Sequence, residues 1–174
     1  GECILFLGAG VHAAPPPGSA YSYPEPERPP RGGELARHLA AKSKLLSRCP
    51  GENIDNLQRV AFDFELQGGR SRRELVEEIE KLVSVGKQPS PVVRGLAALD
   101  FPLVMTTNYD QLFERALFQA GKAPSVSFYN KHPYAETEEH VNFSVSEPYI
   151  LKIHGDIKHH ESVVVTDEDY IDFV

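Results

Sequence analysis

The stretch VMTTNYDQLFERAL, residues 104–117, places the end of a short apolar segment directly before an amphipathic helix. The apolar segment ends at Met105, and from Leu112 onward the apolar residues recur at helical spacing. Asn108 and Asp110 are therefore expected at a corner between a strand and a helix. In open α/β sheets such corners lie at the carboxyl ends of the strands, where ligands bind. Both residue types are also favoured caps of helix N-termini, so a capping role is the simpler alternative.

A second corner of this kind lies near the start of the chain. Residues 3–7, CILFL, form a short apolar run bounded by glycine, which is typical of a buried parallel strand. Gly8 and Gly10 follow as a G-x-G pattern, in which a bare backbone can approach a phosphate closely. As a dinucleotide fingerprint the pattern is incomplete, because position 13 is Ala and no acidic partner can be assigned about 20 residues further on.

A third corner is KIHGD, residues 152–156, where an apolar segment runs into a histidine and a glycine. His154 is suited to acid–base chemistry because the pKa of imidazole lies near neutrality, and Gly155 permits a sharp exit from the strand. The commoner role of a single histidine is a surface or capping position, and the chain contains seven. A metal site would have to use His154, Asp156, His159 and His160, whose spacing fits no zinc pattern.

The remaining chain contains one proline-rich segment and several helical patterns. Residues 13–32 hold seven prolines, which predicts a loop with polyproline II character, either a surface linker or a lid beside the glycine turn. Apolar spacing predicts helices over 34–46, 54–66, 71–86 and 90–99, the third opening with a capping box and the fourth with Ser and Pro. Further strands are predicted at 102–106, 149–153 and 163–165, and residues 130–147 form a polar, irregular surface excursion.

This alternation of strands and helices predicts an α/β fold. We expect a Rossmann-like doubly wound parallel sheet with a mainly helical insertion over residues 34–99. Residues 1–174 would form one domain that is incomplete at its C-terminus, because the last predicted helix has only begun at Val174.

Composition excludes several classes of function. A net charge of −7 without a concentrated basic surface argues against nucleic-acid binding by this segment. No apolar run approaches the roughly 20 residues that span a bilayer, so no membrane association is expected. The two cysteines, Cys3 and Cys49, make neither a zinc site nor a secreted disulfide scaffold, which favours a cytoplasmic protein.

Taken together and in this order, the three corners resemble the sirtuin family. GAG at residues 8–10 is similar to the opening nucleotide-binding turn of that family, and TTNYDQLFERA at 106–116 to its T-Q-N-x-D-x-L-x-x-x-A segment. IHGD at 153–156 is similar to the histidine–glycine motif. The resemblance runs from about residue 4 to at least residue 157, and VVVTDEDYIDF at 163–173 resembles the continuation in a divergent bacterial branch.

The resemblance implies a Rossmann-type domain that binds NAD and cleaves the bond between nicotinamide and ribose. By this likeness Asn108 would contact the nicotinamide-side ribose and position the attacking group, and His154 would be the general base toward a ribose hydroxyl. Gly8, Ala9 and Gly10 would hold the pyrophosphate. The implied cofactor-binding set also includes Val11, Thr107 and Asp110; Thr107 replaces the glutamine of the family, and Asp110 could be structural.

One departure from the family pattern decides which reaction the resemblance implies. Deacylase sirtuins carry two cysteine pairs for a structural zinc after the histidine motif, whereas no cysteine follows His154. We therefore expect that no zinc is bound and that water is the nucleophile. NAD would then be the substrate of a glycohydrolase. Zinc-less relatives imply an NAD-depleting effector of bacterial anti-phage defence, held in check as a homo-oligomer or by a sensor module or partner.

Two alternatives remain open. The domain could bind NAD or ADP-ribose as a regulatory or assembly module without turnover, although a pure binder has less need of both Asn108 and His154. A lysine deacylase or ADP-ribosyltransferase is disfavoured by the missing cysteines.

Overall fold

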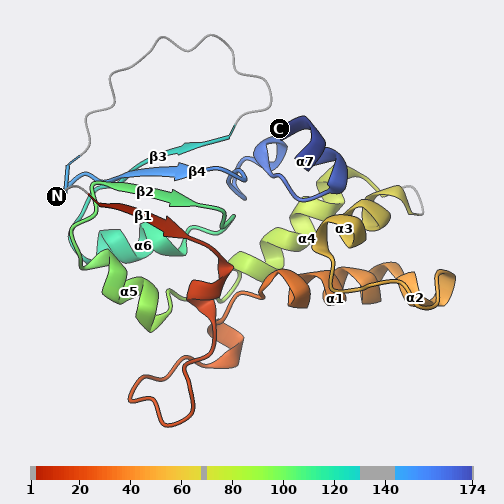
Figure 1. The fold of residues 1–174 in the computed structure, drawn as a ribbon, viewed down its shortest axis with the longest axis horizontal. Coiled ribbons are helices and arrows are strands. Elements are labelled where there is room, and N and C mark those ends of the chain that lie inside the picture. The colour runs from red at the N-terminus through yellow and green to blue at the C-terminus, as the bar shows by residue number, and fades with distance from the viewer. Residues whose placement is uncertain (1–2, 68–69, 130–143, 174) are drawn as a thin grey trace.

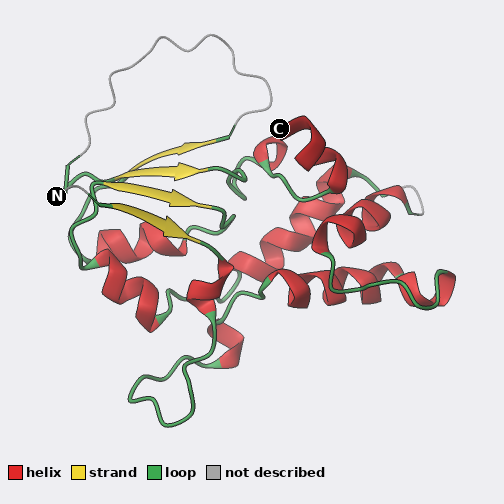
Figure 2. Ribbon diagram, in the orientation of Figure 1, coloured by secondary structure: helices red, strands yellow, loops and turns green. Residues whose placement is uncertain are grey.

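The computed structural model describes residues 3–67, 70–129 and 144–173. It consists of a parallel sheet with two helices against it and a group of helices beyond the carboxyl ends of the strands (Figure 1; Figure 2). Most of the excursion predicted over 130–147 lies outside the described residues. In the part of the chain that the structure describes, no helix is long and apolar enough to cross a bilayer.

Four strands form the sheet: β1 (Ile4–Leu7), β2 (Leu103–Thr106), β3 (Ser125–Phe128) and β4 (Tyr149–Lys152). They are ordered β1-β2-β4-β3 and all neighbouring pairs are parallel. Leu7 pairs with Thr106, and Thr106 pairs with Lys152, so the last residues of three strands are aligned. The expected α/β fold with a parallel sheet is confirmed, and the register brings the three sequence corners to one edge.

Helices α5 (Pro91–Ala97) and α6 (Leu112–Gln119) cover one face of the sheet (Figure 2). Their apolar sides pack on alternate strand residues in a core that includes Leu7, Val104 and Ile150. This alternation places Ile4 and Phe6 on the opposite face, where both side chains are 60% exposed. Within residues 34–99, α5 therefore belongs to the layer of the sheet, whereas the helices before it do not.

The helical group comprises α1 (Gly32–Ser43), α2 (Leu45–Arg48), α3 (Leu57–Leu66), α4 (Arg72–Ser84) and α7 (Asp167–Phe173). It has its own core, in which Leu39, Phe64 and Ile79 are almost completely buried. The capping box predicted at the start of α4 is confirmed, since Ser71 and Glu74 each bond to the other's backbone N–H. The predicted N-cap of α5 is also confirmed, because Ser90 Oγ accepts from Val93 N–H.

Two strand predictions differ from the structure. Residues 163–165 are not a strand: Val163 and Val165 pack into the helical core, and the backbone of Val164 bonds to His154 and to the Tyr109 hydroxyl instead of to a neighbouring strand. The prediction of a strand there was wrong because a buried apolar run has the same sequence signature in either setting. Strand β3 was missed because Ser125–Phe128 is short and half polar.

Helix boundaries differ modestly. The helix predicted from residue 34 is interrupted at Lys44, whose φ of 56° lies in the left-handed region and separates α1 from α2. The helix predicted from residue 54 begins at Leu57, with Asn56 as its N-cap. In both cases a capping residue sets the helix boundary, although the apolar spacing extends past that residue.

The proline-rich segment 13–32 contains one short 3₁₀ turn, Glu25–Glu27, and lies against the connection between α4 and α5. Tyr23 donates from its hydroxyl to the carbonyl of Gln88 over 2.8 Å, and the Gln88 N–H donates to the carbonyl of Glu27 over 3.0 Å. Burial raises the pKa of Tyr23 to about 12, so the phenol stays protonated and able to donate. The second half of the segment is therefore fixed to the body of the protein.

Candidate functional site

The three corners meet around a cavity of about 200 Å³ at the carboxyl edge of the sheet. Five residues singled out from the sequence line it: Ala9, Thr107, Asn108, Asp110 and His154. The remaining wall comes from the proline-rich segment, the start of α1 and the helical group, including Pro29, Pro30, Gly32 and Tyr170. The cavity therefore lies between the sheet and the helical group.

Backbone hydrogen bonds hold the corners together just beyond the sheet. The N–H of Thr107 donates to the carbonyl of Leu7 over 3.1 Å, and the N–H of Ile153 donates to the carbonyl of Thr106 over 2.9 Å. Both bonds continue the parallel ladder by one residue past the strands. Asn108 and His154 are thereby fixed in position by neighbouring strands, although 46 residues separate them in sequence.

The Asp110 side chain has two partners, and one of them lies at the start of α6, whose N-cap position is Gln111 and not Asp110. Its Oδ1 accepts from the N–H of Leu112, the first residue of α6, over 2.9 Å. Its Oδ2 lies 3.4 Å from His12 Nε2. Burial alone would raise the pKa of this carboxyl, but the hydrogen bond and charge of His12 and the Leu112 N–H hold it below its usual range. Asp110 therefore both fixes the turn that leads into α6 and places a carboxylate at the cavity.

Asn108 is positioned by its backbone, and no hydrogen bond joins its side-chain amide to the part of the chain that the structure describes. Its N–H donates to Thr106 Oγ1 over 3.0 Å, which folds the chain back at the end of β2. The residue is half-buried and lines the cavity. An amide in this place can offer both a carbonyl acceptor and N–H donors to a ligand.

His154 lies between the end of β4 and helix α7. Its Nδ1 is 3.4 Å from the hydroxyl of Tyr170, and its ring meets those of Tyr170 and Phe173 edge to face. Burial lowers the pKa of His154, so the neutral imidazole predominates at neutral pH. With Nδ1 facing Tyr170, Nε2 is the nitrogen left to act as a base.

Gly155 is required by the turn that follows His154. Its φ of 85° lies in the left-handed region, and a Cβ atom there would meet the backbone oxygen of Ser162 at 2.1 Å. The sharp exit expected from the sequence is confirmed, and it has a steric cause as well as a conformational one.

His12 is part of the cavity wall but was not assigned a role from the sequence. The side chain is 4% exposed, Nε2 faces Asp110, and Nδ1 is buried without a hydrogen-bond partner among the described residues. The sequence signal was its place directly after the glycine turn. Only the fold shows that it reaches Asp110.

Lys152 is a second residue that sequence reasoning missed. Its side chain is completely buried, and Nζ donates to the carbonyls of Tyr109 and Asp110 and to the carboxylates of Glu114 and Asp156. Burial opposes this charge, yet the two carboxylates hold the pKa of Lys152 above its usual range. Lys152 thus joins the second corner, helix α6 and the third corner through one ammonium group.

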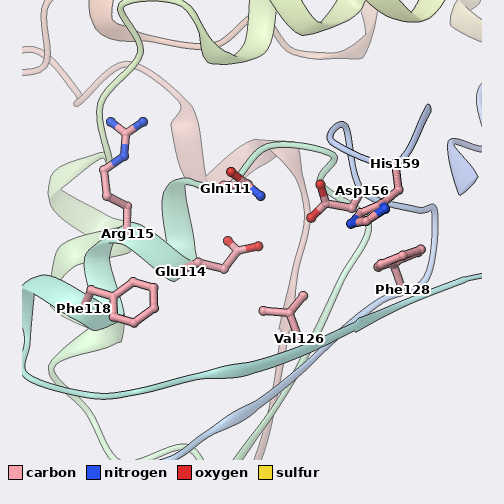
Figure 3. A pocket seen from close by; sticks show the side chains of 8 residues that line it. All are labelled: Gln111, Glu114, Arg115, Phe118, Val126, Phe128, Asp156 and His159. Carbon is pink, nitrogen blue, oxygen red and sulfur yellow. The ribbon is translucent and has the colours of Figure 1, made fainter.

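Glu114 and Asp156 also line a separate cavity of about 390 Å³ between α6 and β3, shown in Figure 3. Neither Asn108 nor His154 contributes to its lining. His159 is stacked on Phe128 at its edge, with ring centroids 4.2 Å apart. This cavity is therefore distinct from the one lined by Asn108 and His154.

Gly8, Gly10 and Val11 are not in the cavity lining. Val11 packs against the core beneath the sheet, and neither Gly8 nor Gly10 has a positive φ. A Cβ atom at Gly10 would meet no protein atom within 4 Å, so neither backbone conformation nor internal packing requires glycine there. Open space beside the Gly10 backbone is compatible with a ligand at this turn.

The residues weighed for a metal site have other partners. Asp156 is bonded to Lys152, His159 lies on Phe128, and His160 Nε2 lies 3.3 Å from Glu80. Over residues 3–67, 70–129 and 144–173, no group of three or more His, Cys, Asp or Glu could hold a metal ion.

Nearly the whole chain is similar in sequence to known proteins. Residues 102–174 match the SIR2-like domain family. The chain is 38% identical over 170 residues to the NAD(+) hydrolase ThsA of Enterococcus faecium, covering 98% of this chain and 31% of that protein. It is 30% identical over 166 residues to the NAD(+) hydrolase ThsA of Acinetobacter baumannii (strain 532279), covering 95% and 30%. Defense-associated sirtuin 2 of Bacillus subtilis is 32% identical over 98 residues, covering 55% and 9%.

These matches confirm the sirtuin-like resemblance. The family match includes two of the three corners, those of Asn108 and His154, and the alignment that covers 98% of the chain includes the glycine turn as well. The chain spans less than a third of the length of the relatives that it matches.

Proposed function

We propose, from the premise that residues 102–174 belong to the SIR2-like domain family, that this chain cleaves NAD to nicotinamide and ADP-ribose. The main structural support is the cavity in which Asn108, Asp110 and His154 come together from two strand ends beside the glycine turn. The names of the two NAD(+) hydrolases support the same reaction. NAD is then a substrate, and the chemistry requires no metal.

The size of the cavity indicates which part of NAD it holds. Pockets that enclose a drug-sized ligand measure roughly 300 to 1,000 Å³, so a cavity of about 200 Å³ accommodates only part of a dinucleotide. We assign it to nicotinamide and the adjoining ribose. The pyrophosphate would then lie over Gly8, Ala9 and Gly10, where Gly10 leaves its backbone uncovered.

In the reaction, the electron pair of the bond between nicotinamide and ribose leaves with nicotinamide, which becomes neutral. Positive charge develops on the ribose, and the carboxylate of Asp110 at the cavity wall stabilises it electrostatically. The amide of Asn108 binds the ribose and orients the attacking water, whose oxygen forms the new bond to the ribose carbon. In this step Asn108 thus positions the reactants, and Asp110 stabilises the developing charge.

His154 acts as the base. Its lowered pKa keeps the imidazole neutral at physiological pH, and Nε2 accepts the proton of a ribose hydroxyl while the bond breaks. The hydroxyl is restored after water has added, and one proton leaves to solvent. The products are nicotinamide, ADP-ribose and a proton, so that atoms and charge balance. Thr107 and Val11 complete the set of residues that we place near the cofactor.

We further propose that residues 1–174 form one cytoplasmic NAD-cleaving domain whose activity is regulated. An enzyme that depletes NAD requires restraint, which assembly into a homo-oligomer or a sensor partner would provide. The likeness to a defense-associated sirtuin supports a role in anti-phage defence. The exposed apolar residues Ile4 and Phe6 leave one face of the sheet available for further contacts.

The test is mass spectrometry of NAD incubated with the intact protein, its native partners included. Nicotinamide and ADP-ribose should appear with the wild-type protein and fall at least about 100-fold with Asn108→Ala, the scale of a lost transition-state contact. Asn53→Ala, an exposed asparagine outside the cavity, serves as the matched control and should cleave at the wild-type rate. Equal cleavage by Asn108→Ala and wild type would refute the assignment.

The alternative is a module that binds NAD or ADP-ribose without turnover. Saturable binding of NAD with no product under the same conditions would favour it. Transfer of a labelled acetyl or ADP-ribosyl group to protein would instead revive the deacylase or transferase alternative.

A further inference from the structure

A larger cavity, of about 540 Å³, adjoins the reaction cavity. The two share three lining residues, His12, Pro29 and Pro30, which form the wall between them. The larger cavity is enclosed by the end of the proline-rich segment, the start of α1 and Lys87 in the connection between α4 and α5. None of Asn108, Asp110 and His154 lines it, so it lies outside the cavity assigned to nicotinamide and the adjoining ribose.

Two buried nitrogen atoms of its lining residues have no hydrogen-bond partner among the described residues: Arg28 Nε and His12 Nδ1. Native structures satisfy nearly all buried polar groups, because a buried group without a partner has lost the hydrogen bonds that it made with water. The His12 side chain is 96% buried, being 4% exposed, and its other ring nitrogen already faces Asp110. These two unpaired nitrogen atoms are typical of a binding site in which a ligand supplies the missing hydrogen-bond partners.

The charges around the cavity indicate the sign of that ligand. Arg28, Arg31 and Lys87 are the permanent cations of the lining, against the carboxylates of Glu25 and Glu34. Glu34 and Arg31 offset each other, since Glu34 accepts from the backbone N–H of Arg31 over 2.8 Å and from its guanidinium over 3.2 Å, which leaves Arg28 and Lys87 against Glu25. His38, also in the lining, faces Glu78 over 2.9 Å. An excess of positive charge remains at this cavity in a chain whose net charge is −7.

We propose that this cavity binds a phosphate-bearing small molecule, with the Arg28 guanidinium as the principal contact and His12 as the shared wall with the reaction cavity. A guanidinium binds phosphate through two parallel charge-assisted hydrogen bonds, which Lys87 can supplement as a point charge. The volume exceeds what a free phosphate ion fills and lies in the range of pockets for small organic ligands. The ligand class is therefore a phosphorylated metabolite such as a nucleotide.

The direct test is calorimetric titration of the intact protein with inorganic pyrophosphate as the probe. The wild-type protein should bind it saturably, and Arg28→Gln should weaken binding at least 10-fold. Arg37→Gln is the matched control: Arg37 lies on the same helix as Glu34, pairs with Asp55 over 2.7 Å and does not line the cavity, so binding should change less than 2-fold. No saturable binding by the wild type, or equal binding by Arg28→Gln, would overturn the proposal.

Two further measurements separate this site from the proposed NAD site. A crystal structure of the pyrophosphate complex should place a phosphate within hydrogen-bonding distance of Arg28; density only at the turn of Gly8–Gly10 would overturn the proposal. Thermal unfolding of Arg28→Gln and of Arg28→Lys shows whether each variant is folded, and Arg28→Lys should recover part of the binding. None of these readouts uses NAD cleavage, so the binding site and the cleavage reaction can fail independently.

Discussion

The ammonium of Lys152 donates a hydrogen bond of 2.6 Å to the backbone carbonyl of Asp110, at the corner after the neighbouring strand. The same ammonium lies 2.7 Å from Asp156 Oδ2, two residues after His154. One buried side chain therefore fixes the segments that carry the two proposed catalytic residues. Lys152 touches neither Asn108 nor His154 in these contacts, so its role is one of positioning.

Replacing Lys152 by methionine should destabilise the protein by about 3–5 kcal/mol, because Glu114 and Asp156 would be left buried without their cation. The free energy of unfolding in urea measures this change. Lys158→Met removes an exposed ion pair with Glu80 and should cost at most about 1 kcal/mol. Equal effects of the two substitutions would contradict the assigned role of Lys152.

Asp110 should contribute stability that depends on pH. Because its pKa is depressed in the folded protein, the stabilisation is complete above the unfolded value of 3.8 and is lost as pH falls through the lower folded pKa. Asp110→Asn should therefore be less stable than wild type near pH 7, and the difference should shrink at pH values below 3.8. Urea unfolding at several pH values measures it, and a difference that stays constant with pH would argue against the carboxylate.

Gly155→Ala should be strongly destabilising. The positive φ and the close approach to Ser162 leave no space for a Cβ atom, so the substitution should lower the free energy of unfolding by more than about 1 kcal/mol. Gly10→Ala, whose added Cβ meets no protein atom, should change the free energy of unfolding by less than about 0.5 kcal/mol. If the cleavage proposal holds, Gly10→Ala should instead raise the KM for NAD, since the added methyl group would lie beside the pyrophosphate.

The pH dependence of NAD cleavage should report His154. A base with a lowered pKa is already neutral at pH 7, so kcat/KM should be flat there and fall only below the usual imidazole value of 6.5. Tyr170→Ala would expose the ring to water and should move this acidic limb to higher pH. His160→Gln, at a histidine paired with Glu80, should leave the profile unchanged. An acidic limb that does not respond to Tyr170→Ala would indicate that a different group titrates.

The local rules of the sequence were sufficient for most elements. Ser71 and Glu74 identified the start of α4 because a capping box satisfies backbone groups within one turn. The corner that carries Asn108 was predicted between Met105 and Leu112, because the spacing of apolar residues changes there from that of a strand to that of a helix. The strand prediction over residues 163–165 was wrong, because an apolar pattern indicates burial but not whether the segment pairs with a neighbouring strand.

What the sequence determined by itself was the identity of the three corners and, through their order, the resemblance to the sirtuin family and the parallel α/β fold. These are properties of short segments, in which each glycine, asparagine or histidine follows its own strand. Only the tertiary structure decided that His12 meets Asp110, that Lys152 joins two corners, and that Arg28 lines a cavity beside them. Lys152 and Asp110 are 42 positions apart and His12 and Asp110 are 98 apart, and the position of Arg28 depends on how a long loop docks. Such pairings arise from strand register and packing rather than from local spacing.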